Sequence, residues 1–271
     1  MARRVRLDAE LARRKLAPSR TAAQQMIHAG EVVVEGVAVP KPSSQVTADQ
    51  SIKLTRQTPR YASRGALKLL GALEDLAVDP AGRTALDAGA AHGGFTDVLL
   101  RRGAHHVIAV DVAYGQLAWE LRTDDRVTLL ERTNVRTLTP QALPDGRIAD
   151  FVVADLSFIS LTKVLPALSA VSADPVTMLP MVKPQFEAGR ELVGKNGVVR
   201  DPSTWASAMR HVTEFADTLE LSLLGAAPSR APGPAGNIEF FLHLQRGVAR
   251  DDRPDPADII QGAVDAARAI G

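Results

Sequence analysis

Apolar runs alternate with helix-like segments through most of the chain, and this alternation predicts a parallel sheet flanked by helices. Strand-like runs rich in Val, Ile, Leu and Phe fall at residues 84–87, 107–111, 127–131, 150–155, 176–183, 221–226 and 238–244. The last two lie close together in the sequence. We therefore expect a seven-stranded, mostly parallel α/β sheet of the doubly wound kind.

The beginning of the chain has a different order, in which two short helices precede a hairpin. One helix is expected over 9–14, and a second follows a Pro-Ser-Arg break at 18–20 with its apolar side chains on one face. Two valine-rich runs then flank a turn at Glu35-Gly36, and the run 51–54 closes the unit.

A polar, proline-containing stretch at 57–63 separates these two patterns and predicts a linker. The chain should therefore consist of a small α+β domain at 1–56 and an α/β domain at 64–271. The larger domain should begin with a helix over 66–76. An amphipathic pattern over 256–270 predicts a final helix that packs on the sheet.

Composition narrows the chemistry. With 45% hydrophobic and 23% charged residues, the 271-residue chain is typical of a globular protein of two unequal domains. The absence of cysteine excludes a disulfide scaffold, a thiol nucleophile and thiolate metal sites, and the six histidines form no metal-binding array, so no metal is expected. No apolar run is long enough for a membrane span and no secretory signal is visible, so we expect a cytoplasmic protein with no membrane partner. We also expect a monomer.

Charge is divided unevenly along the chain. Residues 1–68 contain 13 Lys and Arg against 5 Asp and Glu, whereas the remainder contains 19 against 26. The front segment is thus strongly basic and the rest acidic, which favours a polyanionic partner for the front segment. A solvated charged face is the alternative.

A glycine-rich stretch from Thr84 to Thr96, TALDAGAAHGGFT, joins the first strand of the sheet to a helix. Glycines let the backbone approach a ligand closely, and the N–H groups at the start of the helix point to the same place. The alternative is a tight turn between a strand and a helix. The spacing D-x-G-A-x-x-G-G resembles motif I of the FtsJ-like RNA ribose methyltransferases, which bind S-adenosylmethionine (SAM).

This resemblance implies a Rossmann-like class I SAM-dependent methyltransferase domain. Asp111, which ends the second strand, can accept hydrogen bonds from ribose hydroxyls; the alternative is a helix N-cap. Thr133 and Asn134 would reach the adenine. The residues that the resemblance implies for SAM binding are Asp87, Gly89, Ala90, Gly93, Gly94, Phe95, Asp111, Thr133, Asn134 and Asp155.

The basic front segment resembles the S4 RNA-binding domain. The resemblance rests on Arg6-Leu7-Asp8, on Ser19-Arg20 and on the run from His28 to Gly36, HAGEVVVEG. Arg and Lys suffice for contacts to RNA backbones. The residues that we expect to bind RNA are Arg3, Arg4, Arg6, Arg13, Arg14, Lys15, Arg20 and Arg64.

Asp155 and Lys183 each follow an apolar strand, and buried charges at neighbouring strand ends should pair. One interpretation is a salt bridge that only closes the sheet. The other is methyl transfer to a ribose 2′-hydroxyl, which must be activated at neutral pH. RNA ribose 2′-O-methyltransferases use a Lys-Asp-Lys-Glu tetrad, and Lys68, Asp155, Lys183 and Glu239 occupy the matching places.

Taken together, the S4 module, the glycine loop and the segments ADLSFIS, VKPQFE and GNIEFF resemble the TlyA family over nearly the whole chain. The resemblance implies 2′-O-methylation of a cytidine in ribosomal RNA of the small and large subunits. Lys183 would activate the hydroxyl, Asp155 and Glu239 would orient and balance the lysines, and Lys68 would complete the site.

Two other functions stay open at this point. One is a non-catalytic RNA-binding or ribosome-assembly factor with a degenerate methyltransferase fold, and the other is a pore-forming haemolysin, a label attached to members of this family. A further hypothesis is that the linker, which includes Tyr61, couples RNA contact to SAM binding.

Overall fold

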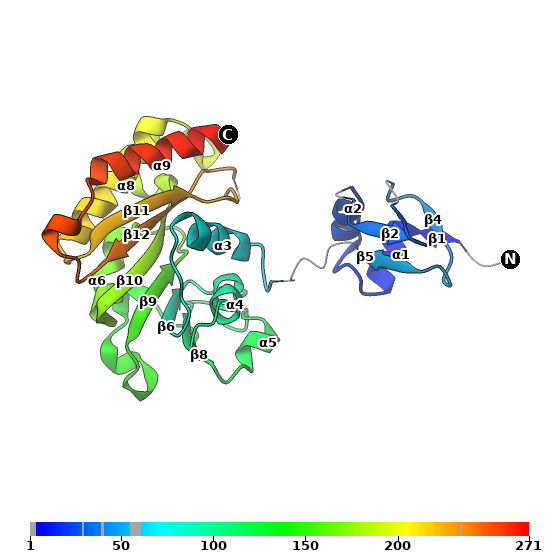
Figure 1. Cartoon of the computed structure of the whole chain (residues 1–271), viewed down its shortest axis with the longest axis horizontal. Coiled ribbons are helices and arrows are strands. Elements are labelled where there is room, and N and C mark those ends of the chain that lie inside the picture. The colour runs from blue at the N-terminus through cyan, green and yellow to red at the C-terminus, as the bar shows by residue number, and fades with distance from the viewer. Residues whose placement is uncertain (1–3, 29, 39–40, 55–60, 234, 271) are drawn as a thin grey trace. The chain divides into compact units, whose positions relative to one another are not determined.

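The structure is a computed structural model that describes residues 4–28, 30–38, 41–54, 61–233 and 235–270. The chain divides into two compact units, Met1–Arg60 and Tyr61–Gly271 (Figure 1). Of the predicted linker, residues 57–60 lie outside the described residues, and the remaining three begin the larger unit.

The smaller unit has the predicted order of helix, helix and hairpin. Its helices are α1 (Leu7–Arg13) and α2 (Arg20–His28), and its strands are β1 (Val5–Arg6), β2 (Val32–Val34), β3 (Val37–Ala38), β4 (Gln45–Val46) and β5 (Ile52–Leu54). Strands β3, β2 and β5 form one antiparallel sheet, and β1 pairs with β4. The Ser19 hydroxyl accepts a hydrogen bond from the Ala22 N–H and so caps the start of α2, directly after the predicted break. Leu7, Leu11 and Ile27 are buried in the core.

The larger unit is built on a seven-stranded sheet, which confirms the predicted α/β fold. The strand order is β11-β12-β10-β9-β6-β7-β8, and every neighbouring pair is parallel except those made by β12, which is antiparallel to both β10 and β11. The strands are β6 (Thr84–Ala88), β7 (His106–Val110), β8 (Val127–Leu130), β9 (Ala149–Ala154), β10 (Ser172–Val182), β11 (Ser222–Pro228) and β12 (Phe240–Gln245).

The order of the parallel strands determines where a ligand can bind. From β6 the chain runs outward through β7 and β8, and then crosses to β9 and β10 on the other side of β6. The connections that leave β6 and β9 thus diverge to opposite sides, which opens a crevice at the carboxyl ends of these strands.

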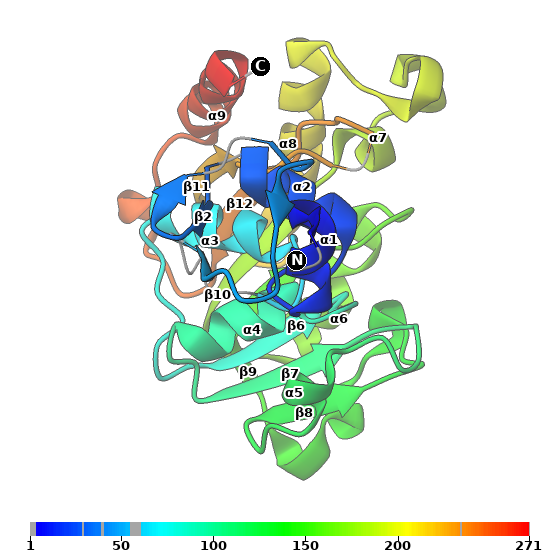
Figure 2. The ribbon, with the colours of Figure 1, turned by 90° about the vertical axis from the view of Figure 1, so that its right-hand side faces the viewer.

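Helices cover both faces of this sheet. They are α3 (Ala66–Asp75), α4 (Gly94–Arg101), α5 (Trp119–Arg122), α6 (Leu165–Ala170), α7 (Pro184–Glu187), α8 (Pro202–Asp217) and α9 (Pro256–Ile270). The core on one face packs α3 and α4 against the sheet, and the core on the other face packs α6, α8 and α9 (Figure 1). The turned view of Figure 2 shows α5 near β8 at one edge of the sheet and α9 near β11 at the other.

The sequence located the strands to within a few residues, except at the start of β10. That strand begins at Ser172 rather than at the expected Val176, because Ser172 already pairs with Ala149 before an irregularity in the ladder. The intervening Asp174 and Pro175 are exposed and were therefore not recognised as strand residues. The predicted final helix is confirmed, and Ile260, Val264 and Ala267 of α9 are buried against the sheet unit.

Candidate functional site

Four charged side chains from distant parts of the sequence meet beside the carboxyl ends of β9 and β10. Lys68 comes from α3, Asp155 and Lys183 directly follow β9 and β10, and Glu239 directly precedes β12. The pairing of Val182 with Phe240 continues to place Lys183 opposite Glu239. These four residues, which we call the tetrad, are the set that the sequence predicted to be catalytic.

The tetrad is closely connected through short contacts. Lys183 Nζ lies 2.5 Å from Asp155 Oδ1, and Lys68 Nζ donates to Glu239 Oε2 at 2.6 Å. Longer contacts complete the cluster, from Lys68 Nζ to Asp155 Oδ2 at 3.6 Å and from Lys183 Nζ to Glu239 Oε1 at 4.0 Å. Each cation therefore faces both carboxylates.

The tetrad side chains are largely buried, which makes the loss of any one charge costly in free energy. The side chains of Lys183 and Glu239 are only 7% and 1% exposed, and those of Lys68 and Asp155 are 12% and 21% exposed. Two cations and two anions give no net charge, but removal of any one leaves a poorly solvated charge without its partner. Asp155 is the most exposed member and lies on the open side of the cluster.

A cavity of about 480 Å³ lies next to the tetrad and shares Asp155 with it. Its lining residues are Gly89, Ala91, Val110, Asp111, Val112, Asn134, Val135, Arg136, Asp155, Leu156, Ser157, Phe158, Ile159 and Val164. Apolar side chains can enclose a base, the Asp111 carboxylate can accept from hydroxyls, and an acidic wall suits a positively charged sulfonium. The residues present therefore fit SAM, and Gly89, Asp111, Asn134 and Asp155 are the predicted cofactor residues that line this cavity.

The glycine loop forms one wall of the cavity through its backbone. Gly89 and Gly93 both have a φ of +90°, a conformation that other residues rarely adopt. A Cβ on Gly89 would lie 2.5 Å from the Asp155 carbonyl oxygen, so only glycine allows β6 and β9 to approach this closely. Asp111 accepts the N–H of Ala91 at 2.8 Å and that of Ala113 at 2.7 Å, which fastens the loop to the end of β7. Asp111 caps no helix, because α5 begins only at Trp119.

Six of the predicted cofactor residues do not line the cavity. They are Asp87, Ala90, Gly93, Gly94, Phe95 and Thr133. Phe95 is buried, with its ring centroid 6.0 Å from that of Phe241. The Thr133 hydroxyl donates to the Glu131 carbonyl, whereas the Asn134 side chain accepts the Arg136 N–H and caps a short 3₁₀ turn.

Asp87 is fully buried behind the glycine loop. Its Oδ2 accepts the Thr96 hydroxyl at 2.6 Å, and its Oδ1 has no hydrogen-bond partner within the described structure. Burial, opposed by the Thr96 hydrogen bond and assisted by the negative charges of Asp155 and Asp111, raises the pKa of Asp87 to about 7. Asp87 therefore lies in the core beneath the glycine loop and is not part of the cavity wall.

Sequence reasoning missed the contribution of the segment that follows β9. Ser157 accepts the Lys183 ammonium at 3.3 Å, and Phe158 is 90% exposed at a φ of +63°. An exposed aromatic residue in a non-glycine left-handed conformation marks a segment shaped for contact. The available signal was the motif ADLSFIS itself, in which a polar, aromatic run directly follows a strand-ending aspartate.

In the smaller unit, two buried carboxylates hold the predicted RNA-binding arginines. Asp8 accepts from Arg6 at 2.9 Å and from Arg20 at 3.3 Å. Hydrogen bonding by Arg6, opposed by burial, holds the pKa of Asp8 well below its usual range. The Arg6 and Arg20 side chains are 43% and 57% exposed, so they can still reach a ligand.

Glu10 holds Arg13 and Arg14 in the same way as Asp8 holds Arg6 and Arg20. It pairs with Arg13 at 2.6 Å and with Arg14 at 2.7 Å. Arg14 also donates to the carbonyls of Thr47, Ala48 and Gln50, so its guanidinium is mostly committed to the fold. Of the other predicted contacts, Arg4, Lys15 and Arg64 are exposed, and Arg3 lies outside the described residues.

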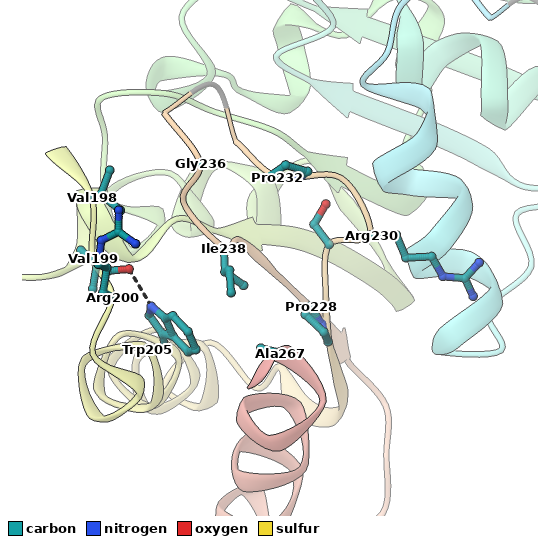
Figure 3. A pocket seen from close by; sticks show the side chains of 11 residues that line it. Val198, Val199, Arg200, Trp205, Pro228, Arg230, Pro232, Gly236, Ile238 and Ala267 are labelled. Atoms are coloured by element: carbon teal, nitrogen blue, oxygen red, sulfur yellow. Dashed lines mark hydrogen bonds between the residues drawn. The ribbon is translucent and has the colours of Figure 1, made fainter. Parts of the chain in front are cut away.

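A second cavity, of about 410 Å³, backs the loop that leads to Glu239 (Figure 3). Trp205 donates its indole N–H to the Val199 carbonyl at 3.0 Å on one side, and Ile238 forms part of the wall. Figure 3 shows Arg230 directed away from this space toward α3, where it pairs with Glu74 and Asp75. None of the four tetrad residues lines this cavity.

Within the described residues, no cluster of three or more His, Cys, Asp or Glu is arranged to hold a metal ion. In the same part of the chain, no helix has both the length and the apolar character needed to cross a membrane.

Comparison with known proteins gives strong matches over both units. The FtsJ-like methyltransferase family model matches residues 61–246, and the S4 domain model matches residues 5–52. A Mycobacterium tuberculosis relative named 16S/23S rRNA (cytidine-2′-O)-methyltransferase TlyA is 51% identical over 251 residues, which cover 92% of this chain and 93% of the relative.

Two further matches extend this picture. A Campylobacter jejuni relative named 23S rRNA (cytidine-2′-O)-methyltransferase TlyA is 31% identical over 193 residues, which cover 71% of this chain and 74% of the relative. A solved structure of a candidate hemolysin from Streptococcus thermophilus has a TM-score of 0.74 and 38% sequence identity, and the match covers 100% of this chain and 98% of that one.

Proposed function

The chain belongs to the TlyA family of FtsJ-like methyltransferases, and from this premise we propose that it transfers the methyl group of SAM to the 2′-hydroxyl of a cytidine in ribosomal RNA. The matches confirm all three resemblances that the sequence suggested, to the FtsJ-like methyltransferases, to the S4 domain and to the TlyA family. The observation that carries the proposal is Asp155, which contacts Lys183 at 2.5 Å and also lines the adjacent cavity. A methyl donor in that cavity would therefore lie next to the tetrad.

The cofactor would occupy the cavity between the glycine loop and the segment after β9, with Asp111 as the acceptor for its ribose hydroxyls. SAM would supply an electrophilic methyl group on a positively charged sulfur. The carboxylates of Asp111 and Asp155 favour that charge.

Lys183 is the residue that we propose to activate the 2′-hydroxyl. Its Nζ is held by Asp155 and Ser157, which fixes the direction in which it can meet a substrate oxygen. SAM would supply the methyl group, and its carbon–sulfur bond would break as the new oxygen–carbon bond forms. Lys183 would stabilise the developing negative charge on the oxygen as an ammonium, or accept the hydroxyl proton as a neutral amine after first losing its own. Lys68 and Glu239 keep the cluster electrically balanced while this happens.

RNA binding is proposed for the smaller unit, which matches the S4 domain. Arg6, Arg13 and Arg20 are oriented by Asp8 and Glu10 toward a ligand that carries phosphates. The name of the M. tuberculosis relative covers both 16S and 23S rRNA, and we propose the same two substrates for this chain, in the cytoplasm where ribosomes are assembled.

The direct test is transfer of a labelled methyl group from SAM to purified unmodified ribosomal subunits, followed by alkaline hydrolysis of the RNA. A 2′-O-methyl group removes the internal nucleophile that cleaves the chain, so the label should appear in an alkali-resistant dinucleotide. Lys183→Ala should reduce transfer by about 10²–10⁴-fold, whereas Lys163→Ala, which replaces an exposed lysine outside the tetrad, should not. Label in mononucleotides would mean base methylation and would refute the assigned roles.

The methyl-transfer experiment also tests the first alternative, and a leakage assay tests the second. A non-catalytic assembly factor would bind subunits without transferring label. The description of the S. thermophilus structure as a candidate hemolysin makes membrane activity worth testing, and leakage from lipid vesicles at low protein concentration would support that alternative.

A further inference from the structure

The segment that follows β9, residues 155–161, supplies groups to both parts of the site. Asp155 belongs to the tetrad, Ser157 accepts from Lys183, and the side chains from Leu156 to Ile159 line the cofactor cavity. Residues 155–160 belong to no helix or strand, and Leu161 begins a short 3₁₀ turn. The position of the segment must therefore be fixed by contacts from elsewhere.

Glu187 makes the contacts that fix the far end of this segment. The Ser160 hydroxyl donates to Glu187 Oε2 at 2.6 Å, and the Leu161 N–H donates to Glu187 Oε1 at 2.8 Å. The two carboxylate oxygens thus accept hydrogen bonds from two consecutive residues. Ser160 in turn caps the 3₁₀ turn Leu161–Lys163 by accepting the Thr162 N–H.

Glu187 also lies close in sequence to the tetrad residue Lys183. Glu187 is the last residue of α7, the short helix that starts directly after Lys183. The preceding residue, Phe186, packs on Phe158 with ring centroids 5.1 Å apart. Helix α7, which follows β10, therefore holds the segment that follows β9 at two points, through Glu187 and through Phe186.

The cost of placing a half-buried carboxylate at position 187 indicates that its two hydrogen bonds are needed. Among the described residues, no ion pair to Lys, Arg or His compensates its charge. Burial raises its pKa, against the lowering effect of its hydrogen bonds to Ser160 and Leu161 and of the nearby His211. A half-buried carboxylate without an ion pair is costly, and an apolar side chain would fill the same space at a lower cost.

We infer that Glu187 is a positioning residue, which fixes the segment 155–161 against Lys183 so that the cofactor cavity and the tetrad keep their common geometry. The inference rests on the proposed function, because it assigns SAM to the cavity. Glu187 does not line that cavity and acts through Ser160 and Leu161.

The test measures SAM affinity by calorimetry, well below the unfolding midpoint, for the wild type, Glu187→Ala, Glu187→Gln and Ser160→Ala. Glu187→Ala removes both acceptors and should raise the SAM dissociation constant about tenfold or more. Glu187→Gln should restore most of the affinity, because its amide oxygen can accept the Leu161 N–H and its amide nitrogen can donate to the Ser160 hydroxyl. Combining Glu187→Ala with Ser160→Ala should add little to Glu187→Ala alone, since both changes break the same contact.

Leu244→Ala serves as the control for general destabilisation, because Leu244 is buried in the sheet at the end of β12 away from Glu239. It should lower the melting temperature and leave SAM affinity unchanged. If Glu187→Ala lowers the melting temperature but binds SAM like the wild type, or if Leu244→Ala weakens SAM as much, the inference is overturned. A wild-type protein that fails to bind SAM would instead overturn the proposed function itself.

Discussion

Replacing Asp87 with asparagine should change the stability of the larger unit in opposite directions at low and high pH. The Asp87 carboxyl is fully buried, and only its Oδ2 has a hydrogen-bond partner in the described structure. Burial raises its pKa from 3.8 to about 7. Between these two values the folded protein keeps the proton on Asp87, whereas the unfolded chain has already lost it.

The sign of the effect follows from proton binding. The folded state binds more protons than the unfolded state in this window, so the free energy of unfolding of the wild type falls as pH rises from about 4 to about 7. The rise in the pKa corresponds to roughly 4 kcal/mol for the charged form, at about 1.4 kcal/mol per pKa unit. Asparagine does not titrate, so the free energy of unfolding of the variant should not show this fall with pH.

An opposing cost accompanies the substitution at every pH. The new amide N–H₂ would occupy a position where Asp87 Oδ1 now has no partner, which costs about 1–3 kcal/mol. The Asp87→Asn variant should therefore be less stable than the wild type by about 1–3 kcal/mol near pH 4 and more stable by a similar amount near pH 8.

Urea unfolding of both proteins, followed by tryptophan fluorescence across this pH range, measures the effect. The only two tryptophans, Trp119 and Trp205, lie in the larger unit, so the signal reports on that unit. Subtracting the variant from the wild type cancels all other titrating groups, and Asp125→Asn, at an exposed aspartate, should give a difference that is independent of pH. A constant difference for Asp87→Asn as well would refute the assignment of a raised pKa to Asp87.

Three further substitutions test other parts of the molecule. Gly233→Ala would place a Cβ 2.7 Å from Glu239 Oε1 and should lower methyl transfer at least tenfold. The control Gly262→Ala adds its Cβ where the space is open and should leave methyl transfer unchanged. Equal transfer rates for the two variants would contradict the tetrad geometry. Asp8→Asn should weaken binding to ribosomal subunits about tenfold in filter assays, since two arginines lose their common anchor, and unchanged binding would remove that role. Tyr61→Ala removes the ring under a guanidinium of α4, and should weaken SAM binding several-fold; unchanged SAM affinity and methylation would end the linker hypothesis.

The elements of the fold could be predicted because their sequence signals are local. The strands β6, β7 and β9 are apolar runs that end at a polar residue, and burial on both faces demands such runs. Asp111 and Lys183 directly follow their strands as expected. The tetrad was found through its resemblance to a family, since nothing local in the sequence indicates that Lys68 would reach Glu239.

What the sequence could not reveal was the direction and the partners of individual side chains. Asp87 carries the motif signal of a cofactor ligand, but its carboxyl turns back toward Thr96. Arg14 belongs to a basic cluster, but it is largely occupied by Glu10 and by backbone carbonyls. Such outcomes depend on residues far away in the chain, and a single sequence without the fold does not specify them.

The position of β12 determines when the protein can become active during its own synthesis. Glu239 lies 171 residues after its partner Lys68, directly before the strand that inserts between β10 and β11. Until this strand leaves the ribosomal exit tunnel, a nascent chain can assemble β6 to β10 and present Lys183 and Asp155, but the lysine of α3 has no buried carboxylate to meet. The tetrad is therefore complete only once β12 has joined the sheet between β10 and β11, so all seven strands must be in place before the site can act.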